Sequence, residues 1–510
     1  MALNKESRTV NVGKNATSAL FNKFAILILT FISRRFFIQY IGVEYLGING
    51  LFSNILTLLS MADLGLGTAM NVSLYKPIAE NDEKKLAALL SYFKQIYYFI
   101  AIAVTVIGLG LIPFLPYIVN LDSNIPHLYL FYVIFILKNT VSYLFVYKSS
   151  IISADQKNYL INRIDLLVNF SRVVIQIVVM ILFKNYLAYI LVELLGIMIH
   201  NFAISFIADK QYPFIRNQEE LSKEEKKSFF TDMYSAFLYK VAGSILNGTD
   251  NVLISIIVST IAVGLYSNYS TITHNLELFI MLLFNSLTAS VGNLVATSSS
   301  NKRYEAYKSM QMIGNWMGSY ISICLFYLIQ DFMLIWLHDS RFVMDNYVLF
   351  AIVINMYYTI CMRPVWTFRE GTGMYKQIRF IMFATAVVNL ILSVVLGKLI
   401  GVGGILIATT IAKLFTCFWY EPSLLFKGFF GVKPISYYKD YSFNIIITLF
   451  AGTLCYFPLQ LLSNIQTGIG AFLLKGIICT IIINIVFFIR YYKTAEFSFI
   501  KHKILQLKNR

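Results

Sequence analysis

Two adjacent arginines, Arg34 and Arg35, stand inside the otherwise apolar segment FISRRFFIQYIG, residues 31–42. Counted from Lys23 as the membrane boundary, Arg34 lies roughly 16 Å along a helix, near the middle of a hydrocarbon core of about 30 Å. A lipid-facing arginine at this depth costs about 2.5 kcal/mol or more, so at least one of the two should face protein or a watery cavity. Guanidinium groups stay charged there and hold phosphate through paired hydrogen bonds, so the pair is a candidate anion-binding site.

The alternative is a structural ion pair, most simply with Asp63 in the next apolar segment. A shift of 217 residues matches Asp250 with Ser33 and Asn251 with Arg34, so the second half of the chain carries an acid at almost the same depth as the cation of the first half. Asp63 and Asp250 are therefore candidates for ion coupling or for ion pairing. Other ionisable groups expected inside membrane spans are better explained as structural partners: Lys138, Arg172, Glu193, His200, Lys240, His274, Glu277, Lys413 and Lys475.

The elements that position these residues are membrane-spanning helices. The 510-residue chain is 58% hydrophobic and only 13% charged, about half the charge of an ordinary soluble domain. Its apolar runs show none of the alternation of a membrane β-barrel. We expect an all-α membrane protein with fourteen spans, at about 18–40, 48–74, 95–119, 126–148, 160–183, 185–207, 229–258, 261–297, 310–337, 346–368, 378–398, 401–420, 441–463 and 468–490. The first span is expected to be retained, because no cleavage site follows it.

The distribution of the basic residues predicts the orientation. Most of the 42 Lys and Arg residues fall in loops on one side, together with both termini, whereas the opposite loops hold Lys184, Arg341 and Lys398. By the positive-inside rule the termini are cytoplasmic. The net charge of +16 is thereby explained without nucleic acid.

In the cytoplasmic segment 208–228, Ser222 and Glu225 have capping-box spacing and predict a short helix. The segment ENDEKKLAALLSYFK, residues 80–94, predicts either a helix on the membrane surface or a polar extension of the third span.

An internal repeat divides the chain. At offsets of 217 and 218, Lys23 matches Lys240, Gly47 matches Gly264, and Lys84 and Lys85 match Lys302 and Arg303. We predict two pseudo-symmetric six-helix lobes around a central cavity, related by an axis along the membrane normal, plus two C-terminal helices. The predicted parts are residues 1–208 (spans 1–6), 209–228 (cytoplasmic linker), 229–420 (spans 7–12), 421–490 (spans 13–14) and 491–510 (basic cytoplasmic tail).

No residue pattern indicates catalysis or a bound metal. The glycine-rich run MADLGLGTA, residues 61–69, lacks the strand and the GK[ST] of a phosphate loop, and His200 and His274 have no ligands at metal spacing. The five cysteines show neither pairing nor metal spacing. We expect no enzyme activity, no cofactor and no metal.

Three segments carry a family resemblance. YLGINGLFSNILTLLSMADLGLGTAM (residues 45–70), YKPIAENDEKKL (75–86) and NGTDNVLISIIVSTIAVGLYSNYSTI (247–272) resemble the Wzx-type flippases of polysaccharide biosynthesis, in the multidrug/oligosaccharidyl-lipid/polysaccharide exporter superfamily. The resemblance covers spans 1–12 and implies alternating-access transfer of undecaprenyl-diphosphate-linked oligosaccharide from the inner to the outer leaflet of the bacterial cytoplasmic membrane. It also implies that Arg34 and Arg35 hold the diphosphate. The expected partners are lipid-linked glycan, membrane lipids and polysaccharide polymerase machinery.

Other functions remain open from the sequence. Many Wzx-type proteins have twelve spans, whereas fourteen are shared with the lipid II flippases of the same superfamily, so lipid II is an alternative substrate. A multidrug or cation antiporter of the same fold would suit an acidic cavity better than one with central arginines. A glycan polymerase would need a sizeable outer loop, and every predicted outer loop is short.

The predicted orientation has a direct test. Single cysteines at Ser222 and Lys302 should be protected from a membrane-impermeant thiol reagent in intact cells, whereas cysteines at Ser123 and Ser340 should be labelled, because the basic loops stay inside. Labelling of the Ser222 position from outside would overturn this topology.

Overall fold

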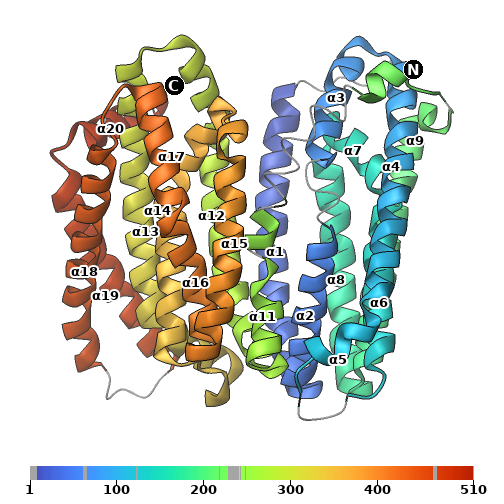
Figure 1. Ribbon diagram of the computed structural model, residues 1–510, viewed down its shortest axis with the longest axis horizontal. Helices are drawn as coiled ribbons and strands as arrows, with labels where there is room; N and C mark the ends of the chain where they lie inside the picture. Colours follow the sequence, from blue (N-terminus) through green and yellow to red (C-terminus); the bar gives the residue numbers. More distant parts are fainter. Residues whose placement is uncertain are drawn as a thin grey trace. The chain divides into compact units, whose positions relative to one another are not determined.

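The computed structural model describes residues 8–60, 66–121, 125–217, 219–227, 241, 243–246, 248–462 and 468–508 (Figure 1). These residues form helices joined by short connections, with no β-strand among them. The chain divides into two compact units, Met1–Gly264 (unit 1) and Leu265–Arg510 (unit 2). The all-α fold is therefore confirmed.

Unit 1 is built from antiparallel helices around two hydrophobic clusters. Its helices are α1 (Arg8–Tyr40), α2 (Val43–Leu59), α3 (Leu66–Glu80), α4 (Glu83–Gly110), α5 (Leu115–Ile118), α6 (Leu128–Tyr143), α7 (Val146–Ala154), α8 (Asn158–Phe183), α9 (Tyr186–Gln211) and α11 (Asp250–Ile257), with 3₁₀ turns at Ile112–Phe114 and Pro213–Arg216. The chain reverses between α1 and α2 at Gly42, whose φ of 108° favours glycine. Between α6 and α7 the helix axis bends by 42°.

The polar segment before the third span is part of one continuous helix. Asp82 caps α4 by accepting a hydrogen bond from the Lys85 backbone N–H at 2.9 Å, and the helix then runs unbroken to Gly110. Leu86 and Phe93 are fully buried against other helices of unit 1. The prediction of a membrane-surface helix is wrong, because its apolar face packs on protein; the alternative, a polar extension of the span, is the structure observed.

The capping box at Ser222 is confirmed. The Ser222 N–H donates to Glu225 Oε2 at 3.1 Å, and the Glu225 N–H donates to Ser222 Oγ at 3.3 Å. Glu225 also forms an ion pair with Lys85 at the start of α4. The hydrogen bond from Lys85, followed by those from Ser222, lowers the pKa of Glu225. This contact joins the segment 219–227 to α4.

Two glycines matched by the internal repeat meet in unit 1. A Cβ on Gly264 would lie 3.0 Å from the Gly47 nitrogen, and a Cβ on Gly47 would lie 2.0 Å from the Thr260 carbonyl oxygen. Only glycine permits this approach between α2 and the start of α12 (Thr260–Thr297). Beside it, Ser255 Oγ of α11 donates to the Ile118 carbonyl at 2.7 Å. The compact unit thus extends to Gly264, past the predicted linker at 209–228.

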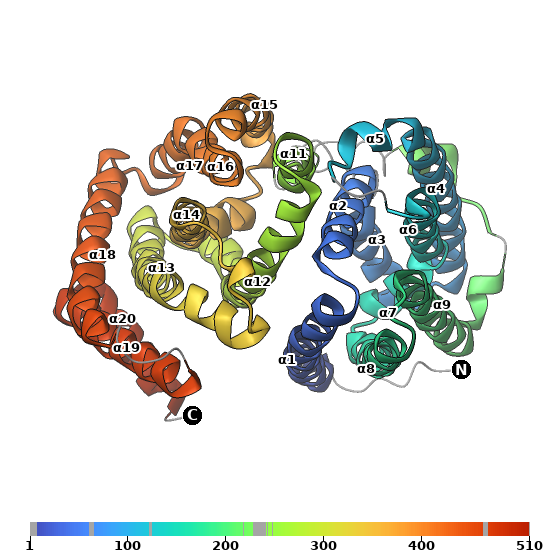
Figure 2. The same cartoon turned by 90° about the horizontal axis from the view of Figure 1, so that it is seen from below.

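Unit 2 contains the longest helices of the described chain. After α12 it consists of α13 (Ser300–Leu337), a 3₁₀ turn (Ser340–Phe342), α14 (Asn346–Thr372), α15 (Tyr375–Ile400), α16 (Val402–Phe415), α17 (Cys417–Leu425), a π-helical turn (Phe426–Phe430), α18 (Ile435–Leu461), α19 (Ile469–Tyr491) and α20 (Ala495–Lys508). Gly314 and Gly318 bring α13 against Pro364 and Cys361 of α14. Helices α18 to α20 lie together beside α13 at one margin of unit 2 (Figure 2).

The helices agree with a protein that crosses the membrane many times. Nine described helices are long and apolar enough to span it, and a tenth is added if α6 and α7 form one bent span. All fourteen predicted spans contain described helical residues. The second, seventh and thirteenth are described only in part, because residues 61–65, 229–240, 242, 247 and 463 lie outside the described set.

A buried ion pair holds α14 to α17. Arg369 Nη1 lies 2.9 Å from Glu421 Oε2, and the two side chains are only 7% and 2% exposed. Arg369 also contacts Glu370 at 3.5 Å. Both side chains are so buried that water could not solvate either charge if its partner were removed. The pair is therefore expected to be required for stability.

Glu421→Gln should therefore destabilise the protein by about 3–5 kcal/mol, because it leaves the Arg369 charge buried without its main partner. The shift of the thermal unfolding midpoint in detergent measures this effect. Glu80→Gln, which breaks the exposed Lys76–Glu80 pair, is the control and should cost less than about 1 kcal/mol. Equal stability of the two variants would show that the buried pair contributes nothing.

Candidate functional site

A carboxylate inside unit 1, Glu193 of α9, gathers cations from two other helices. Lys138 of α6 places Nζ 2.8 Å from Glu193 Oε2, and Arg172 of α8 places Nη1 3.7 Å from Glu193 Oε1. The three side chains are between 10% and 25% exposed. This arrangement is a partly buried triad with two cations on one carboxylate.

Arg34 of α1 belongs to the same neighbourhood through Tyr189 of α9. Tyr189 interacts electrostatically with Arg34, Arg172 and Glu193. One turn after Arg34, Phe37 packs edge-on against Tyr189, with ring centroids 4.8 Å apart. We call Arg34, Lys138, Arg172, Glu193 and Tyr189 the Glu193 cluster.

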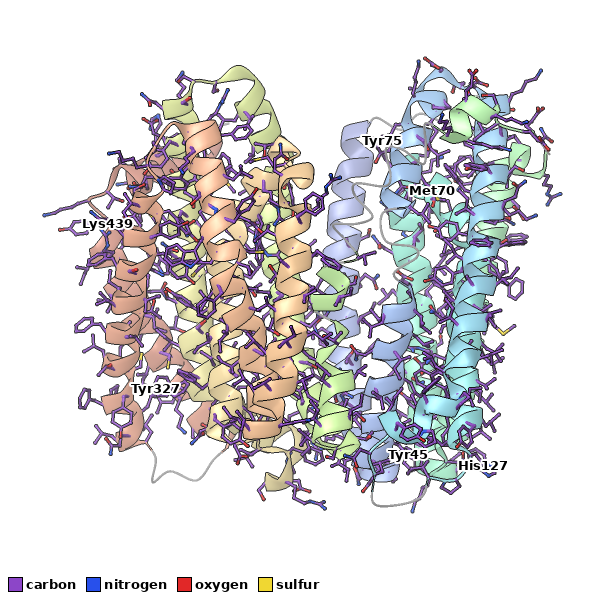
Figure 3. The ribbon with its side chains drawn as sticks, in the orientation of Figure 1. Tyr45, Met70, Tyr75, His127, Tyr327 and Lys439 are labelled. Atoms are coloured by element: carbon purple, nitrogen blue, oxygen red, sulfur yellow. The ribbon has the colours of Figure 1, made fainter. Side chains whose placement is uncertain are left out.

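Lys138, Arg172 and Glu193 meet, with Arg34 near Tyr189 beside them, because the four charged residues lie at similar depths on antiparallel helices. Arg34 lies six residues before the end of α1, Arg172 eleven before the end of α8, Lys138 ten after the start of α6, and Glu193 seven after the start of α9. At 1.5 Å per residue these positions are roughly 9–17 Å from helix ends on the side where Tyr45 and His127 lie (Figure 3). They therefore fall in the central part of a core of about 30 Å.

Local packing fixes the side chains of Lys138 and Arg172. Gly196, one turn after Glu193, leaves room for the Arg172 side chain, since a Cβ there would lie 2.8 Å from Arg172 Cδ. Arg172 Nη2 also donates to Asn169 Oδ1 at 2.9 Å. Lys138 Nζ lies 3.9 Å from the centroid of the Phe135 ring, a cation–π contact. These contacts orient Lys138 and Arg172 toward Glu193.

The cluster carries three cations and one carboxylate, a formal excess of two positive charges. In a partly desolvated site such an excess favours an anion, because opposite charges attract more strongly at low dielectric than in water. A group with two negative charges would balance the cluster. Metal binding has no such support, since the described residues hold no group of three metal-ligating side chains.

The four predicted site residues, Arg34, Arg35, Asp63 and Asp250, do not lie together in one described site. Arg34 belongs to the Glu193 cluster. Arg35 is exposed, and within the described residues no hydrogen bond or ion pair joins it to another side chain. Asp250 is the first residue of α11 and is half-buried. Asp63 lies outside the described residues, so its pairing with the arginines stays a prediction.

The sequence indicated Lys138, Arg172 and Glu193 only one at a time, as structural partners. Their grouping could have been predicted by counting each residue's distance from the same membrane surface, which gives similar depths. A second pair in unit 1, His200 Nε2 to Asp165 Oδ1 at 2.5 Å, joins α9 to α8. Its partner could not be predicted from spacing, because the two residues are on different helices.

Comparison with solved structures identifies the fold. The chain is similar to the lipid II flippase MurJ in its inward closed conformation, with a TM-score of 0.67 and 16% identity over 94% of this chain and 98% of the other. It is also similar to an inward-facing multidrug resistance MATE family transporter of the MOP superfamily (TM-score 0.62, 13% identity, 78% and 96% covered) and to the MATE multidrug transporter DinF-BH (0.53, 16%, 85% and 99%). The chain therefore has the fold of these membrane transporters.

Comparisons by sequence add no closer assignment, since no family model and no curated protein matches the chain.

A double-mutant cycle can test the geometry of the Glu193 cluster. The coupling of Lys138 with Glu193, measured with Lys138→Met and Glu193→Gln, should exceed that of Arg172 with Glu193, because their contact distances are 2.8 Å and 3.7 Å. Glu193→Gln alone should destabilise by about 3–5 kcal/mol, since it strands a buried cation. The measurement is the unfolding midpoint of each purified variant. Equal couplings would contradict the arrangement described.

Proposed function

We propose that the protein is a flippase that moves undecaprenyl-diphosphate-linked oligosaccharide from the inner to the outer leaflet of the bacterial cytoplasmic membrane by alternating access. The observation that carries the proposal is the excess of two positive charges in the Glu193 cluster, to which Arg34 contributes. A lipid diphosphate carries roughly two negative charges, and these charges must pass through the low-dielectric interior of the membrane during transfer. The cluster would compensate this charge and lower the cost of transfer.

Arginine suits this task better than lysine. Its planar fork of donors matches a phosphate bidentately and remains charged in the membrane. We propose that Arg34 and the exposed Arg35 contact the diphosphate, while Glu193 holds Lys138 and Arg172 in place. Asp250 is a candidate for ion coupling, as is Asp63.

Lipid II is the second candidate substrate. The supporting observation is the similarity to a lipid II flippase over 94% of this chain and 98% of the other. A cation exporter of the same fold receives less support, because the Glu193 cluster repels cations. The charge of the cluster alone does not separate one lipid diphosphate from another, since both substrates share this group.

The arginines can be tested by transport. Arg34→Ala should reduce flipping of a fluorescent lipid diphosphate–glycan in proteoliposomes by at least about tenfold, and Arg34→Lys should restore it only in part, because lysine lacks the bidentate fork. Arg35→Ala should also reduce the rate. Lys76→Ala removes an exposed charge of the same sign and serves as the control.

Folding and function are separated by measuring the unfolding midpoint of every variant. A double Arg34→Ala, Arg35→Ala protein that is folded and flips at the normal rate would end the anion-site proposal. Parallel assays with lipid II and with a lipid-linked oligosaccharide that lacks its peptide identify the preferred cargo.

A further inference from the structure

Helices α4 and α6 of unit 1 leave between them an apolar groove with a volume of about 340 Å³. One face of α4, from Tyr98 to Val106, forms one wall, and Thr140 and Leu144 at the end of α6 form the other. At 1.5 Å per residue the wall on α4 is about 12 Å long. Helix α4 lies at a margin of unit 1 (Figure 1), and no residue that lines the groove belongs to the Glu193 cluster.

The groove opens away from the protein interior. Ile102 and Val106 are each 63% exposed and Tyr98 is 40% exposed, although all three are large hydrophobic side chains. From Gln95 to Gly110 the helix carries no charged residue, which suits the hydrocarbon core of a membrane. The molecules that meet this groove are therefore membrane lipids.

The two threonine hydroxyl groups of the groove are already used inside the protein. Thr105 Oγ1 lies 2.7 Å from the Ala101 carbonyl oxygen and 2.6 Å from Thr140 Oγ1. Thr140 Oγ1 in turn lies 3.0 Å from the Ile136 carbonyl oxygen. The single hydrogen of each hydroxyl thus has an acceptor within the protein. The part of a ligand that enters the groove should therefore be apolar.

A cation, Lys94, lies at the end of the groove nearest the start of α4. It is the last charged residue of this helix, it is exposed, and its Nζ lies 5.5 Å from the centroid of the Tyr98 ring. Among the described residues no carboxylate forms an ion pair with it. The distance along the helix from Lys94 to Val106 is about 18 Å, close to half of a hydrocarbon core of about 30 Å. A lipid whose headgroup lies at Lys94 thus has its chain beside the groove.

We propose that this groove is a binding site for an anionic phospholipid, with the phosphate on Lys94 and one acyl chain along α4 from Tyr98 to Val106. The charge of Lys94 complements the headgroup, and the apolar walls complement the chain. The predicted orientation places Lys94 at the cytoplasmic leaflet, where anionic lipids attract basic side chains. This lipid stays bound and is not the transported cargo, so the proposal does not depend on the proposed function.

The test uses the full chain in nanodiscs of phosphatidylcholine that contain a small fraction of phosphatidylglycerol with a photoreactive group in its acyl chain. After illumination, mass spectrometry should find the label on peptides that cover residues 98–106 and 140–144. Phosphatidylcholine with the same photoreactive chain should label these peptides about fivefold less, since one lysine near an anionic lipid contributes about this factor.

Lys94→Gln should lower the labelling by phosphatidylglycerol about fivefold and leave the labelling by phosphatidylcholine unchanged. Val106→Trp places a bulky ring in the groove from its exposed side and should lower the labelling by both lipids. The matched controls are Lys210→Gln, an exposed cation in the last turn of α9, and Ile175→Trp, a 49% exposed position on α8. Both should label as the unchanged chain does, and the unfolding midpoint of each variant verifies its fold.

Three results would overturn the inference. The first is equal labelling of the groove by the two lipids in the unchanged chain. The second is a folded Lys94→Gln protein that keeps the preference for phosphatidylglycerol, or a folded Val106→Trp protein that labels normally. The third is displacement of the label by a polyprenyl diphosphate more readily than by unlabelled phosphatidylglycerol, which would make the chain of the cargo the occupant.

Discussion

The attraction between Glu193 and the cations around it is the interaction on which the interior of unit 1 depends. Lys138 and Arg172 could not share a partly buried position without a carboxylate, because each unpaired charge would cost several kcal/mol. Glu193 binds Lys138 most closely, at 2.8 Å, and Arg172 at a longer distance. The same carboxylate leaves the cluster with an excess of positive charge. The stability of unit 1 and the proposed affinity for an anion thus depend on the same group of residues.

Unit 2 uses intramembrane charge differently. Arg369 pairs with Glu421 at 2.9 Å and also contacts Glu370, and Lys475 pairs with Asp331 at 2.6 Å. These pairs join α14 to α17 and α19 to α13. They hold helices together without the excess charge of the Glu193 cluster. This difference in charge between the units is the basis for proposing that unit 1 binds the charged part of the cargo.

Close approach at glycines is the second constraint on the fold. Gly47 and Gly264, which the predicted internal repeat matches, meet each other, and Gly314 and Gly318 let α13 pack on α14. Helices in a membrane gain little from hydrophobic burial against one another, so packing at small residues and a few polar contacts must hold them. Side chains at these glycines would push the backbones apart.

The sequence by itself determined the helical class, the approximate spans and the capping box at Ser222, because each depends on residues close together in the chain. It also singled out Arg34, since a charge in an apolar run needs a partner wherever it lies. Tertiary structure alone decided which residues lie around it, among them Tyr189. Lys138, Arg172 and Glu193 come from three helices, and a span's composition does not say which of its faces meets which neighbour. The burial of Leu86 and Phe93 was decided in the same way, because an apolar helix face suits a membrane surface and a protein interior equally well.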